Sequence, residues 1–113
     1  MSTVNGKIIV SSKAPTVSAV RVVVRIRDVT YPDTPELVEE IQMVRNVAPD
    51  MPPIDFSIGV PDDKLSDKVN LNLEVHIDLD GSGNFSPGDL VSMKSHRILP
   101  DTRDIDVPVS VVE

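Results

Sequence analysis

The strongest constraint on how this chain folds is an alternation of apolar and polar side chains with a period of two residues. The alternation is clearest over residues 69–77, which lead directly into a glycine-rich segment. Successive side chains of a β-strand point to opposite faces of its sheet, so this pattern predicts a half-buried strand. The apolar positions are Val69, Leu71, Leu73, Val75 and Ile77, and the polar ones are Asn70, Asn72, Glu74 and His76.

Further strand signals occur in five segments, namely residues 4–10, 20–27, 54–60, 90–99 and 105–111. In the second of these, the β-branched run Val22, Val23 and Val24 favours a strand over a helix. Pro108 lies inside the last segment. Because proline has no N–H to pair with a neighbouring strand, its presence predicts that 105–111 is an edge strand.

Residues 37–45 fit either a helix or a strand. Leu37, Ile41 and Val44 are spaced like one face of a helix, whereas the alternation through residues 38–44 fits the exposed face of a strand. The residues alone slightly favour the helix.

The spacing of these segments indicates the fold class. About six to eight short strands with a turn signal every 8–12 residues are typical of an all-β domain. Ten prolines agree with such a chain, and its 113 residues suffice for one core only. We therefore expect residues 1–113 to form a single domain, an antiparallel β-sandwich.

The charge is acidic and unevenly distributed. The formal net charge is −7, and the chain has three aromatic residues. Nucleic-acid binding is not expected, because phosphate contacts need clustered cations. Residues 1–30 nevertheless hold five Lys and Arg side chains against one Asp. We expect these cations to pair across strands with the acidic remainder, and a basic docking stripe of Arg21, Arg25 and Arg27 is the alternative.

Several functional classes lack their sequence signatures. The chain contains no cysteine, which excludes disulfides, thiolate catalysis and a cysteine-linked lipid anchor in these residues. It has no apolar run of about 18 residues for a membrane span and no signal-peptide pattern. A strained Gly-x-Ser-x-Gly turn is also missing. The expectation is a non-enzymatic, unanchored protein in the cytoplasm.

Only residues 78–89 combine residue type and spacing into a specific chemistry. Oxygen-bearing side chains stand at loop positions 1, 3, 5, 9 and 12, with glycine at position 6. This layout is that of an EF-hand calcium loop. Phe85 is expected to fix the loop to the core. The predicted Ca²⁺ ligands are Asp78, Asp80, Ser82, Asn84 through its main-chain carbonyl, Ser86 through a water, and Asp89.

Two departures from the EF-hand pattern weaken the predicted calcium site. Position 12 is Asp rather than Glu and position 5 is Ser, so the expected Kd is about 10⁻⁴–10⁻³ M. Glycine and asparagine also suit a hairpin turn without metal, and another divalent ion is a further alternative. His76 and His96 flank the loop and are expected to be exposed strand residues rather than zinc ligands.

The strand patterns also resemble a known family. Three segments are similar to strands of the YbaY/YscW-type lipoprotein domain. They are residues 4–10, residues 20–29 together with the Asp33-Thr34-Pro35 turn that follows them, and residues 56–61. That family includes secretin pilot lipoproteins. The resemblance implies a small β-sandwich or open barrel, a strand over 37–45, and a place in the periplasm or at the outer membrane. It also implies that an apolar surface holds a partner's peptide.

Two classes of function follow. The first is a non-enzymatic binding or chaperone-like module that holds a protein or peptide segment. The second is a structural domain that calcium stabilises through residues 78–89 and that has no other ligand.

Overall fold

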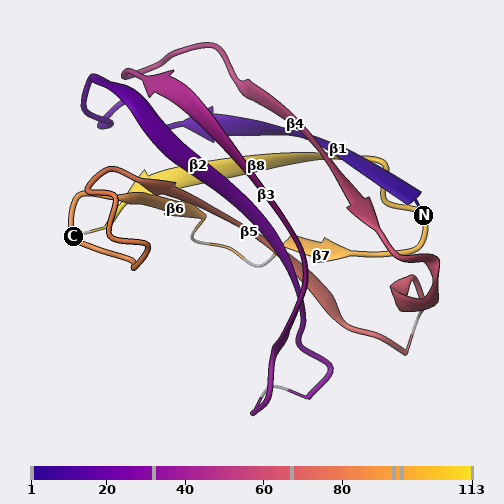
Figure 1. Cartoon of the computed structure of the whole chain (residues 1–113). Coiled ribbons are helices and arrows are strands. Elements are labelled where there is room, and N and C mark those ends of the chain that lie inside the picture. The colour runs from indigo at the N-terminus through magenta and orange to yellow at the C-terminus, as the bar shows by residue number, and fades with distance from the viewer. Residues whose placement is uncertain (1, 32, 67, 93, 95, 113) are drawn as a thin grey trace.

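In the computed structural model, the described part of the chain folds into eight strands and one short 3₁₀ turn (Figure 1). The structure describes residues 2–31, 33–66, 68–92, 94 and 96–112. Within this part of the chain, no helix has the length and apolar character of a transmembrane segment. The elements are β1 (Ser2–Val10), β2 (Val17–Asp28), β3 (Glu36–Val47), β4 (Ile54–Val60), η1 (Asp62–Lys64), β5 (Leu71–Asp78), β6 (Leu90–Ser92), β7 (His96–Ile98) and β8 (Asp104–Val111).

The strands form one sheet that curls into a nearly closed barrel. Their order is β3-β2-β5-β6-β8-β1-β4, and β7 pairs with β5. The two end strands, β3 and β4, come into contact without forming a ladder. The predicted all-β, open-barrel-like architecture is therefore confirmed. The predicted sandwich of two sheets is replaced by one curled sheet. The sheet is also not wholly antiparallel, because β1 and β8 pair in parallel.

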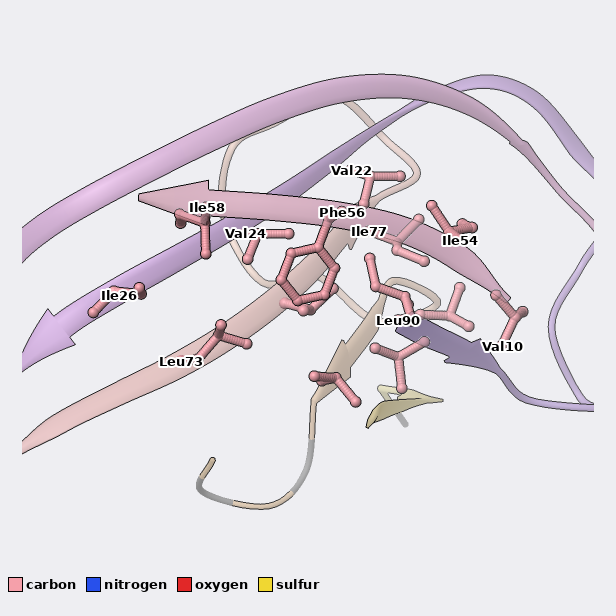
Figure 2. Close-up of a cluster of buried hydrophobic side chains, with 14 of the residues drawn as sticks. Val10, Val22, Val24, Ile26, Ile54, Phe56, Ile58, Leu73, Ile77 and Leu90 are labelled. Atoms are coloured by element: carbon pink, nitrogen blue, oxygen red, sulfur yellow. The ribbon is translucent and has the colours of Figure 1, made fainter. Parts of the chain in front are cut away.

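The apolar positions of the alternating segments line the inside of this barrel. Figure 2 shows side chains from β2, β4, β5 and β6 meeting there around the Phe56 ring. Burial of such side chains is the main favourable term in folding, so the two-residue period positions every strand. Fully buried members include Ile8, Val22, Val24, Ile26, Val60, Leu71, Leu73, Ile77, Leu90 and Val107.

The segment that fitted either helix or strand is β3. It pairs along its length with β2, so the helix favoured by the residues alone is wrong and the strand implied by the family resemblance is confirmed. Ile26 pairs with Glu39 but Arg27 pairs with Leu37, which leaves Val38 as an extra residue in a β-bulge. A bulge interrupts the two-residue period, and the interrupted pattern resembles helical spacing.

Pro108 does not mark an edge strand, because β8 lies between β6 and β1. Backbone groups of a strand point alternately to its two sides. The Val112 N–H donates to the Asp89 carbonyl on the β6 side, so position 108 faces that side too. Among the described residues, the last pair of β8 with β6 is Ser92 with Val109. The missing N–H of Pro108 therefore points beyond the last described pair of this ladder.

The predicted strand over residues 90–99 is present as two short pieces. β6 pairs with His76 and Ile77 of β5, and β7 pairs with Leu71, Asn72 and Leu73 farther along the same strand. The segment thus follows β5 in two separate ladders.

The expected cross-strand charge pairs form. The Lys7 ammonium lies 2.8 Å from Asp55, Arg25 lies 2.6 Å from Glu40, and Arg27 lies 2.8 Å from Glu74. Arg25 and Arg27 are engaged in these ion pairs, so two of the three arginines of the alternative basic docking stripe are already paired within the chain.

Gly6 provides a test of the barrel packing. The Phe56 ring, directly opposite in β4, occupies the space that a Cβ at position 6 would need. We expect Gly6→Ala to lower the free energy of unfolding by about 1–3 kcal/mol through overpacking, as measured by urea denaturation. The loss should shrink in a Phe56→Leu background, and an equal loss in both backgrounds would contradict this packing.

The end of β2 provides a test by pH. The Thr30 hydroxyl and N–H donate to Asp28 at 2.6 and 3.0 Å, and Lys64 lies 3.2 Å away, so the pKa of Asp28 is lowered. A lowered pKa stabilises the fold above the unfolded value of about 3.9, and this stability is lost as pH falls through the folded pKa. The unfolding free energy of wild type should exceed that of Asp28→Asn at pH 7. The two free energies should converge as the pH falls below 4. A difference independent of pH would refute the assignment.

Candidate functional site: the loop between β5 and β6

The loop over residues 78–89 lies against the outer face of the sheet. Val23, His76 and Val91 form a row across β2, β5 and β6 and are only 2%, 1% and 8% exposed, although Val23 and Val91 lie outside the core cluster. The Phe85 ring packs edge-on to His76, with ring centroids 4.6 Å apart. The prediction of an exposed His76 is therefore wrong. Phe85 packs on the outer face and is 57% exposed, so the prediction that it fixes the loop to the core is also wrong.

Asp89 fastens the two ends of this loop together. Its buried carboxylate accepts the Leu79 N–H at 2.9 Å on Oδ1, and the Ser86 N–H at 3.1 Å on Oδ2. His76 Nε2 lies 2.9 Å from the same Oδ2 and, as an N–H, donates to it. A buried charge is tolerated when donors surround it, so these contacts explain an Asp at a dry position. The Asp89 main chain is also bound to Val112, beside the C-terminal end of the chain (Figure 1).

Asp78, at the start of the loop, is 2% exposed and only half satisfied. Its Oδ2 accepts the Gly83 N–H at 2.8 Å, and Gly83 has a φ of +81°, a backbone conformation that favours glycine. Its Oδ1 is buried and has no hydrogen-bond partner among the described residues. Buried carboxylate oxygens are normally paired, so this atom identifies the place where the loop is chemically incomplete.

The other loop oxygens gather beside Asp78. The Ser82 N–H donates to Asp80 at 3.0 Å, and this bond is the main reason that the pKa of Asp80 is lowered, with further contributions from the Ser82 and Ser86 hydroxyls and from a contact with Asp78. Both hydroxyls lie 3.3 Å from the Asn84 carbonyl oxygen and 3.3 Å from each other.

Five of the six predicted ligands, at positions 78, 80, 82, 84 and 86, are thus brought together, whereas the Asp89 carboxylate is turned toward His76. The residue pattern did not indicate that His76 belongs to this loop site. One atom each of His76, Asp78 and Asp89 lies within 4.8 Å of the others, a spacing compatible with metal binding. The only sequence signal was its position two residues before the loop. His96 is not in this group; it pairs with Leu73, and burial, followed by the charge of Lys94, lowers its pKa.

A second feature is the seam, defined here as the line where β3 (Glu36–Val47) meets β4 (Ile54–Val60). Among the described residues, no strand pairs with the seam side of either one. Leu37 and Val44 of β3 are 53% and 62% exposed, and Val38, Ile41 and Met43 are partly buried against the core. The seam therefore offers unpaired backbone next to apolar side chains.

Comparisons with known proteins support the fold. No protein-family model matches the sequence, and no curated protein matches it. A solved structure described as an alternative pilotin from the type II secretion system of Vibrio cholerae is similar, with a TM-score of 0.78 and 14% identity over 99% of this chain and 97% of that one. This likeness supports a pilotin-like fold and does not single out the YbaY/YscW-type family.

The role of Asp89 can be tested by substitution. Asp89→Ala removes the acceptor for one buried and two half-buried N–H donors, so the free energy of unfolding should fall by about 2–4 kcal/mol. Asp101→Ala, at an exposed turn, should change it by less than about 0.5 kcal/mol. Urea denaturation measures both. An Asp89→Ala variant as stable as wild type would show that the carboxylate does not hold the loop.

Proposed function

We propose that this chain is a non-enzymatic binding module of the pilotin kind, which holds a segment of a secretin subunit. The observation that carries the proposal is the likeness to the alternative pilotin, which extends over 99% of this chain. The strand patterns support the same class, because the family that they resemble includes secretin pilot lipoproteins. The location that accompanies this function is the periplasm or the outer membrane rather than the cytoplasm.

The seam is the surface on which we propose that the partner segment docks. Unpaired strand edges readily accept an additional strand, whose main chain contributes hydrogen bonds and whose alternate side chains contribute specificity. A segment paired with β3 would cover Leu37 and Val44, two exposed apolar side chains of this strand. Contact between β3 and β4 limits the opening, so the segment is expected to add at the outer rim rather than enter the barrel.

The charge of β3 indicates which segment fits. Glu36, Glu39 and Glu40 lie on this strand, and Glu40 is paired with Arg25 of β2 at 2.6 Å. Glu36 is exposed and Glu39 partly so, and burying them beside an acidic segment would be unfavourable. The proposed partner segment is therefore apolar at alternate positions and carries Lys or Arg near its start or end.

A hollow of about 360 Å³ elsewhere on the barrel supports the non-enzymatic part of the proposal. Its walls include Lys7, Asp55, Asp104 and Asp106. The Lys7 ammonium is bound to Asp55, which is the main reason that its pKa is raised. A lysine held in the charged form is a poor nucleophile or base.

The proposed docking predicts a binding defect from surface substitutions. Leu37→Lys combined with Val44→Lys should weaken binding to the secretin subunits of the same organism about tenfold or more, because two apolar contacts are replaced by solvated charges. Surface plasmon resonance with purified secretin subunits measures the affinity.

Ile9→Lys is the matched control, since Ile9 is an exposed apolar residue on β1, a strand that is not part of the seam. It should bind like wild type. Equal binding by the double variant would refute docking at the seam, and no binding of wild type to any secretin subunit would refute the proposed function itself.

A further inference from the structure

We propose that the loop over residues 78–89 binds one Ca²⁺ ion through Asp78 Oδ1, Asp80, Ser82, the Asn84 carbonyl and Ser86, while the buried His76–Asp89 pair positions the loop without binding the ion. This site is separate from the seam and does not depend on the function proposed for it.

The donor atoms are already close to one another. The Ser82 and Ser86 hydroxyls and the Asn84 carbonyl oxygen lie within 3.3 Å of each other, and Asp80 interacts with both hydroxyls. Asp78 and Asp80 are also in contact. Two carboxylates and three neutral oxygens form a hard donor set, and waters complete the six to eight ligands that Ca²⁺ prefers.

The buried, unpartnered Oδ1 of Asp78 is a separate reason to infer a cation. The Asp78 side chain is 2% exposed, and its other oxygen is occupied by the Gly83 N–H. The Asp78 carboxylate is in side-chain contact with Asp80, so it lies beside the other loop oxygens. A bound cation satisfies the unpartnered Oδ1, whereas loop hydrogen bonds alone leave it unpaired.

Asp89 has a different role from the one that the sequence assigned to it. Three N–H donors, from His76, Leu79 and Ser86, engage both of its oxygens. Breaking these contacts to reach an ion would leave the donors unsatisfied. Asp89 is therefore a positioning residue, and the site keeps only two charged ligands, which places its Kd at about 10⁻⁴–10⁻³ M.

The same geometry argues against zinc. Zinc favours nitrogen and sulfur ligands in tetrahedral sites, and His76 is the only such donor in the group. Its Nε2 is already bound to Asp89, and Phe85 packs against its ring.

Isothermal titration calorimetry with CaCl₂ at constant ionic strength tests the site. Wild type should bind one Ca²⁺ in the range given above, and 10 mM CaCl₂ should raise its Tm by on the order of 5–10 °C, since the ion binds the folded loop only. Asp80→Asn should bind at least about tenfold more weakly, and 10 mM CaCl₂ should raise its Tm, relative to the same variant without calcium, by less than it raises that of wild type.

Asp101→Asn is the charge-matched control, because it removes one carboxylate from an exposed turn outside the loop. It should bind calcium like wild type. Absence of binding by wild type at 10 mM, equal affinity of Asp80→Asn, or an equal loss in Asp101→Asn would each overturn the site. Tighter binding of ZnCl₂ than of CaCl₂ would contradict the proposed oxygen ligands and would indicate a metal site formed by His76, Asp78 and Asp89.

Discussion

The last four residues of β5 are buried on both faces of the sheet, and the local architecture depends on this constraint. Val75 and Ile77 face the barrel interior, as they do in any half-buried strand, but His76 and Asp78 face outward and are equally dry. Polar groups at such positions need partners, because an unpaired buried polar group costs several times what a typical hydrogen bond contributes. The loop that follows β5 supplies the partner of His76 Nε2 and buries the row of residues beside it.

The loop is therefore a second layer over one corner of the barrel rather than a simple hairpin turn. Phe85 packs on the His76 ring, and Asp89 ties the loop to β5 and, through its main chain, to Val112. A buried His–carboxylate pair is costly to desolvate, and the two backbone N–H donors to Asp89 help to offset that cost. The arrangement holds the remaining loop oxygens in a small volume beside the half-satisfied Asp78, and the calcium proposal rests on that proximity.

Most of the fold was accessible from the sequence because burial on one face imposes the two-residue period directly. The exceptions have local causes. The bulge at Val38 interrupts the period in β3, and the edge assignment of Pro108 assumed a full ladder on both sides of β8. The parallel pairing of β1 with β8 joins the two ends of the chain, and no local pattern encodes such a register.

In the candidate site, too, features that depend on residues close in sequence were predictable, and features that depend on the folded structure were not. The spacing of oxygen-bearing residues identified the cluster of oxygens at positions 78–86, since these residues are near neighbours in sequence. The burial of His76 was not predictable, because it depends on a loop folding back over a polar strand face. The engagement of Asp89 by His76 follows from that fold and from nothing in the twelve-residue pattern. The seam was likewise hidden, because it is formed by β3 and β4, whose free edges are known only from the strand order.

These features divide the molecule into a barrel seam suited to a partner segment and a loop suited to an ion. The claim that the loop is a preformed ion site is tested most directly by a crystal structure grown in CaCl₂. It should show one ion with oxygen distances of about 2.3–2.6 Å to Asp78 Oδ1, Asp80, Ser82, Ser86 and the Asn84 carbonyl, and an intact His76–Asp89 contact. An ion bound to the His76 nitrogen, or a loop in which Asp78 Oδ1 is paired by protein groups and holds no ion, would contradict it.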